Sequence, residues 1–67
     1  MIGDNIKFYR KKNQLTQDDI AEACNVTRQA VSKWENGESL PTVDNLYALS
    51  RLLHTSVDDI LIGEKER

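Results

Sequence analysis

The sequence predicts an all-α fold, a compact arrangement of five short helices in one domain over residues 1–67. Leu, Ile and Val recur at helical spacing, and no two segments show the alternation expected of a strand pair. The only proline, Pro41, falls between two periodic segments, as does Gly37. We expect helices over residues 2–13, 17–24, 28–36, 43–53 and 57–62.

The helix expected over 2–13 has an apolar inner face. Ile2, Ile6 and Tyr9 are separated by four and then three residues, a spacing that brings side chains to one side of a helix. Phe8 is offset from Tyr9 by about 100° around the helix axis. We therefore expect Phe8 to be partly exposed and a candidate for an external contact.

The helix expected over 17–24 has signals at both ends. Thr16 suits the N-cap position, and Asp19 follows it at the spacing of a capping box. Asn25 comes after the last helical residue and tolerates the left-handed conformation that ends many helices. Ala21 has almost no side chain, so a second helix can cross closely at this point.

The helix expected over 28–36 begins after a very short connection. Thr27 is placed as its N-cap, and Gly37 as the residue that ends it. Its apolar residues repeat at helical spacing and should face inward; they are Ala30, Val31 and Trp34. Two short helices joined by a sharp turn have the layout of a helix-turn-helix.

The segment 43–53 carries three leucines at helical spacing, Leu46, Leu49 and Leu52. His54 follows this segment and has no second histidine to share a metal ion, so we expect it to end the helix. Ser56 is then placed as the N-cap of the segment 57–62.

The outer face of the helix expected over 28–36 is rich in hydrogen-bond donors. It carries four polar side chains, Arg28, Gln29, Ser32 and Lys33. Arginine and lysine donate to guanine O6 and N7, glutamine pairs in bidentate fashion with adenine, and serine suits either base. On the helix pattern alone, a solvated polar face is the better interpretation. The adjoining turn favours the other one, in which these residues are candidate base contacts in the major groove of DNA.

Nearly the whole chain resembles a known family, the Cro and lambda-repressor-like (XRE-type) helix-turn-helix proteins. Leu15–Gln17 resembles the family's LTQ sequence at the start of the second helix, and Ser32–Gly37 resembles its SKWENG sequence at the end of the third. The segments 6–10, 40–52 and 56–61 resemble the first, fourth and fifth helices. Three residues stand where family members often have glycine: Gln14, Asn25 and His54. The resemblance implies a DNA-binding regulator of transcription, with a repressor as the first candidate.

The resemblance also implies roles for individual residues. The candidate phosphate contacts are Gln17, Thr27 and Asn36. Gln17 is expected to support Gln29 or Arg28 as well. An ion pair between Arg10 and Glu35 is expected to join the first helix to the third.

The charge distribution favours DNA on the N-terminal side of the chain. The formal net charge is −2, which provides little sequence-independent attraction to phosphates. Residues 1–37 carry six basic and five acidic side chains, which gives +1, whereas residues 38–67 carry three and six, which gives −3. Specific contacts must therefore supply much of the affinity.

No pattern supports catalysis, a metal site or a cofactor. The acid pairs Asp18–Asp19 and Asp58–Asp59 each lie in the first turn after a cap, where the helix dipole stabilises carboxylates. Ser32 has no histidine placed for a triad, and no glycine loop could hold a phosphate. Cys24 is the only cysteine, and its spacing from Ile20 indicates a buried thiol. We therefore do not expect an enzyme. We also expect no small-molecule ligand, because so small a core leaves little room for a pocket.

The sequence also lacks signals for a membrane. No apolar run approaches the roughly 20 residues of a membrane span, and the N-terminus lacks the apolar core of a signal peptide. We therefore expect a cytoplasmic protein.

Leu61 and Ile62 are candidates for a dimer interface, because they are more apolar than the surface of a small domain requires. One helix reads only a few base pairs, so a homodimer on an inverted-repeat operator in double-stranded DNA is expected. The alternative is a protein-interaction module of antitoxin or anti-repressor type, which would bind another polypeptide through the helix over 57–62.

Overall fold

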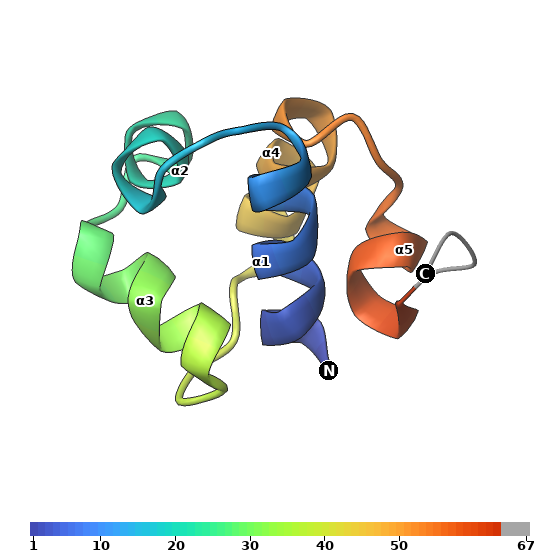
Figure 1. Ribbon diagram of the computed structural model, residues 1–67. Helices are drawn as coiled ribbons and strands as arrows, with labels where there is room; N and C mark the ends of the chain where they lie inside the picture. Colours follow the sequence, from blue (N-terminus) through green and yellow to red (C-terminus); the bar gives the residue numbers. More distant parts are fainter. Residues whose placement is uncertain (64–67) are drawn as a thin grey trace.

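The computed structural model describes residues 1–63, so the last four residues of the domain expected over 1–67 lie outside the described part. Five α-helices form this part of the chain: α1 (Ile2–Lys12), α2 (Gln17–Cys24), α3 (Arg28–Asn36), α4 (Val43–Leu52) and α5 (Val57–Ile62). In Figure 1, α2 and α3 lie on one side of α1, and α5 lies on the other. The predicted all-α class is therefore confirmed.

The bounds of α2, α3 and α5 are those expected, whereas α1 and α4 each end one residue early. Asn13 and Leu53, expected as the last helical residues, are C-caps whose N–H groups still bond to the preceding turn. Each is followed by a residue in the left-handed region, Gln14 at φ 60° and His54 at φ 55°. Because a left-handed residue turns the chain out of the helix, these helices cannot extend further.

Both ends of α2 are built by the residues that predicted them. The Thr16 hydroxyl accepts a hydrogen bond from the Asp19 N–H at 3.0 Å, and the Asp19 carboxylate accepts one from the Thr16 N–H at 2.8 Å. At the other end of α2, Asn25 has φ 58°. The Val26 N–H then donates to the Ala21 carbonyl at 3.0 Å, as in a Schellman motif.

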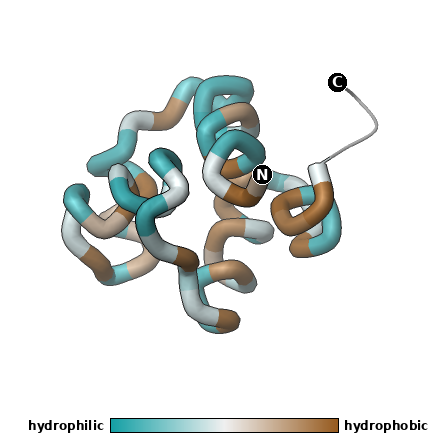
Figure 2. The backbone as a smooth tube through the Cα atoms, turned by 90° about the horizontal axis from the view of Figure 1, so that it is seen from below, coloured by the Kyte–Doolittle hydropathy of each residue, from teal (hydrophilic) through white to brown (hydrophobic). Residues whose placement is uncertain are grey.

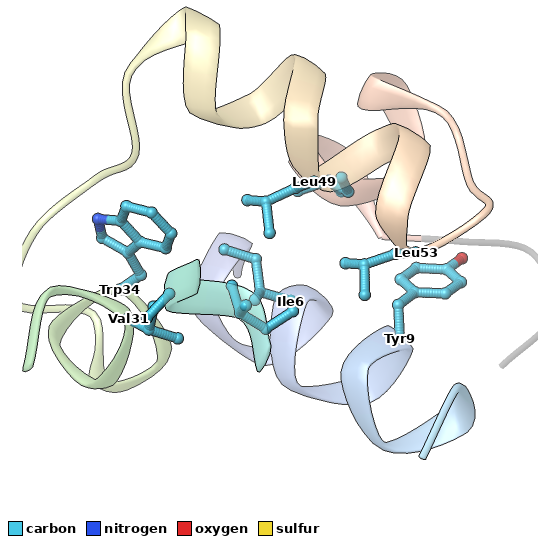
Figure 3. Close-up of a cluster of buried hydrophobic side chains, with 9 residues drawn as sticks. Ile6, Tyr9, Val31, Trp34, Leu49 and Leu53 are labelled. Atoms are coloured by element: carbon cyan, nitrogen blue, oxygen red, sulfur yellow. The ribbon is translucent and has the colours of Figure 1, made fainter. Parts of the chain in front are cut away.

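The core is one cluster of apolar side chains from all five helices. Its buried members are Ile6, Tyr9, Ile20, Ala21, Val31, Trp34, Leu49, Leu53 and Ile60. Figure 3 shows Trp34 and Val31 at one end of the cluster and Tyr9 and Leu53 at the other. Val31 and Trp34 therefore face inward as predicted, whereas Ala30 is half-buried and lies outside this cluster.

Two contacts of α1 fix its neighbours. A Cβ added at Gly3 would overlap the Trp34 carbonyl oxygen and lie 2.7 Å from that of Glu35, so the start of α1 approaches the end of α3 backbone to backbone. Asn5 is fully buried, and its amide Nδ2 donates to the Ile60 carbonyl of α5 at 2.8 Å. Helix α1 thus holds α3 and α5 on its two sides.

Candidate nucleic-acid interface

The four predicted base contacts lie together on α3. Arg28, Gln29 and Lys33 are exposed, and Ser32 is half-buried. Residues 28, 29, 32 and 33 follow the i, i+1, i+4, i+5 spacing of one helix face, opposite the buried side chains of Val31 and Trp34. This face can present donors to an external partner while the other side of α3 fills the core.

Thr27 begins this face and already caps α3. Its hydroxyl oxygen accepts a hydrogen bond from the Ala30 N–H at 3.1 Å. A hydroxyl that accepts one bond still has a hydrogen to donate. The cap therefore leaves Thr27 able to donate to an anion at the N-terminus of α3, where the helix dipole also favours negative charge.

Gln17 and Glu35 are joined in a polar network behind the exposed face. The Arg10 guanidinium donates from Nε to Glu35 Oε2 at 2.7 Å and from Nη2 to Oε1 at 3.2 Å. Gln17 Nε2 donates to the same Oε1 at 3.1 Å, and Arg10 Nη1 donates to the Leu15 carbonyl at 2.9 Å. The Glu35 side chain is only 3% exposed. The expected ion pair between Arg10 and Glu35 is therefore confirmed. The same buried carboxylate of α3 also bonds to Gln17, the first residue of α2.

The structure gives Gln17 a partner that we did not expect. We expected Gln17 to support Gln29 or Arg28, but its amide donates to Glu35. Glu35 is within reach because it lies in the last turn of α3, which packs against α1. This bond uses one amide hydrogen, and the second hydrogen and the carbonyl oxygen of Gln17 have no partner among residues 1–63. These two groups remain able to meet a phosphate or a neighbouring side chain.

Asn36 occupies the far end of the same helix. It is exposed, eight positions after Arg28, which separates the two along the axis by about 12 Å. A cavity of about 160 Å³ opens beside it, between the ends of α1 and α3. That volume is well below the roughly 300 Å³ at which small-molecule sites begin.

Two neighbouring acids in the first turn of α2, Asp18 and Asp19, have different partners. The bonds from Thr16 lower the pKa of Asp19, so the capping carboxylate is charged. Its neighbour Asp18 lies 4.0 Å from Arg28, from Oδ1 to Nε, on the exposed surface. Sequence reasoning missed this pair, since helical spacing gives no contact between residues on two different helices.

Cys24 is half-buried, so the expectation of a buried thiol was only partly correct. Desolvation raises the pKa of the thiol, which keeps it protonated and unreactive.

Within residues 1–63, no group of three or more His, Cys, Asp or Glu side chains could hold a metal ion. In the same part of the chain, every helix is too short or too polar to span a bilayer.

The geometry of α2, the left-handed turn and α3 defines a helix-turn-helix, and comparison with known proteins gives the family. Residues 6–60 match the helix-turn-helix family model. The HTH-type transcriptional regulator DicA of Escherichia coli is 41% identical over 66 residues, which cover 98% of this chain and 49% of DicA. The chain therefore belongs to the XRE-type, lambda-repressor-like helix-turn-helix family.

Solved structures agree with this assignment. The P22 c2 repressor in complex with a synthetic operator superposes with a TM-score of 0.89 at 36% identity, covering 96% of this chain and 97% of that one. The biofilm regulator SinR in complex with DNA gives a TM-score of 0.80 at 34% identity, covering 91% of this chain and 98% of that one. The chain spans about half the length of DicA, 49%, and 30% of the full Repressor protein C2 of Salmonella phage P22.

Proposed function

We propose that this chain is a sequence-specific DNA-binding regulator of transcription that acts as a repressor in the form of a homodimer. The observation that carries the proposal is the exposed donor face of α3, held in place from behind by the Arg10–Glu35–Gln17 network. The P22 c2 repressor and SinR, whose domains superpose on this chain, were each solved in complex with DNA.

In this proposal, one set of residues contacts the bases and another contacts the DNA backbone. The base contacts are Arg28, Gln29, Ser32 and Lys33. The phosphate contacts are Gln17, Thr27 and Asn36. Gln17 and Thr27 stand at the starts of α2 and α3, where N–H groups and the helix dipole favour an anion. Asn36 lies at the other end of α3, so the phosphate contacts would bracket the base-reading face and set its register.

The charge of the chain supports a binder that depends on specific contacts. A formal net charge of −2 gives weak attraction to DNA of arbitrary sequence. The base contacts must therefore provide much of the preference for an operator. A regulator of this kind acts where the chromosome is, so the proposal includes a cytoplasmic location.

A second candidate function is binding to another polypeptide through α5, and exposed apolar side chains favour it. Leu61 is 40% exposed and Ile62 is 79% exposed. Figure 2 shows this apolar stretch of α5 beside the end of the described chain. The same two side chains are our candidates for the dimer interface, so the surface is compatible with both functions.

Selection of bound duplexes from a random DNA pool tests the proposed function directly. We expect one enriched sequence with inverted-repeat symmetry, bound at least 1,000-fold more tightly than random duplex. A pool that shows no enrichment after repeated rounds would reject DNA reading and leave the protein-interaction module as the better candidate.

A further inference from the structure

The ion pair between Asp18 and Arg28 places an acid on the surface proposed to face DNA. Asp18 is the second residue of α2, and Arg28 is the first residue of α3. Oδ1 of Asp18 lies 4.0 Å from Nε of Arg28, and the two side chains are 77% and 66% exposed. A carboxylate here opposes binding to phosphates, so its presence needs an explanation.

Capping does not provide that explanation. Thr16 and Asp19 already form the capping box of α2, and Asp18 takes no part in it. An acid in the first turn does stabilise a helix through its dipole. Asp44 in α4 and Asp58 in α5 occupy the same second helical position, and within residues 1–63 neither has a basic side chain at ion-pair distance. Only in α2 does this acid lie beside a candidate base contact.

The contact with Asp18 involves Nε of Arg28, which leaves the other guanidinium nitrogens able to bond to a base. Asp18 lies nearest to Nε, whereas Nη1 and Nη2 are the ends of the planar fork that can meet guanine O6 and N7 together. A guanidinium can therefore keep its carboxylate partner and still form a bidentate pair with a base. A phosphate, by contrast, would have to approach next to the negative charge of Asp18.

We propose that Asp18 sets specificity by withholding Arg28 from phosphates while leaving it available to a guanine edge. The proposal rests on the DNA-binding function proposed above. In a complex with arbitrary DNA, Arg28 would stay with Asp18 and add no phosphate contact. At the operator, the same arginine would gain its base contact without losing its carboxylate.

The test compares Asp18→Asn with Asp58→Asn, which removes the same charge from the same helical position on α5. Each protein is titrated with the duplex selected by the wild type and with a scrambled duplex of equal length, over a range of salt concentrations. We expect Asp18→Asn to bind the scrambled duplex about two- to fivefold more tightly, the range of an exposed ion pair. The slope of log affinity against log salt should steepen by about one, since one more phosphate is neutralised. Asp58→Asn should change neither quantity.

An Arg28→Ala background shows whether Asp18 acts through the arginine. There, Asp18→Asn should have no more effect than Asp58→Asn. An equal gain with and without Arg28 would mean simple repulsion of DNA by Asp18 and would overturn the proposal. Equal behaviour of the two single variants would also overturn it, while the DNA-binding function stands. If the wild type itself fails to discriminate between the duplexes, the proposed function fails, and the role of Asp18 fails with it.

Discussion

Glu35 accepts hydrogen bonds from Arg10 at 2.7 Å and 3.2 Å, across the packed faces of α1 and α3. The pair is largely shielded from solvent, with 12% of the Arg10 side chain and 3% of the Glu35 side chain exposed. Removal of one partner from such a pair leaves a buried charge without compensation, which costs more than the pair itself contributes. Because Gln17 bonds to the same carboxylate, this pair also positions the start of α2.

We therefore expect Glu35→Ala to destabilise the fold by about 3 kcal/mol. Chemical denaturation followed by the fluorescence of the buried Trp34 measures this loss. The control is Glu38→Ala, which removes an exposed acid just after α3 and should change stability by less than about 0.5 kcal/mol. In the double variant Arg10→Met/Glu35→Leu, the loss should be much smaller than the sum of the losses in the single variants Arg10→Met and Glu35→Leu. Additive losses would show that the two side chains are not energetically coupled.

The close approach of α1 and α3 predicts an unusual effect of alanine at Gly3. In an open helix, Gly→Ala stabilises by up to about 1 kcal/mol. At Gly3, the added methyl group would collide with the Trp34 and Glu35 carbonyl oxygens, so we expect Gly3→Ala to destabilise by about 1–3 kcal/mol. Thermal unfolding measures the sign. An increase in the melting temperature would show that the two backbones can separate at little cost.

These two features mark the limit of what the sequence could predict. The bounds of α2, α3 and α5 were predictable because Thr16, Thr27 and Ser56 are caps, and a cap depends on only three or four neighbouring residues. The close approach at Gly3 and the bond from Gln17 to Glu35 depend on how distant helices pack, which local spacing does not encode. The pair of Arg10 and Glu35 was expected only through the family resemblance, for the same reason.

Base and phosphate contacts should respond differently to mutation. We expect Arg28→Ala and Gln29→Ala each to weaken binding to the operator by about 1–3 kcal/mol, with little change on scrambled duplex. Gln17→Ala removes a phosphate contact in our proposal, so it should weaken binding to both duplexes by similar factors. Fluorescence anisotropy with labelled duplexes measures all three. Equal losses on both duplexes for Arg28, Gln29 and Gln17 would contradict the division of roles.

Gln17→Ala also removes a bond to Glu35, so a stability control is needed. Unfolding of each variant is measured beside its DNA affinity. If Gln17→Ala binds DNA as tightly as the wild type at temperatures well below its thermal unfolding midpoint, the residue contributes to folding alone. Gln17→Glu offers a second check, because it places a carboxylate beside Glu35 and the proposed phosphate and should weaken binding to both duplexes further.

The last prediction concerns the dimer. Two copies of α3 related by a two-fold axis should meet successive major grooves about 34 Å apart, so half-site centres should lie about 10 base pairs apart. Ile62 is 79% exposed and is our principal candidate for the shared surface. Ile62→Glu would place a charge in that apolar contact, so it should weaken binding to the full operator by about tenfold or more while a single half-site is bound as before.

Lys7→Glu, a charge change on the exposed side of α1, serves as the control in sedimentation experiments. A wild-type chain that remains monomeric on an asymmetric half-site, with Ile62→Glu binding as the wild type does, would reject the homodimer.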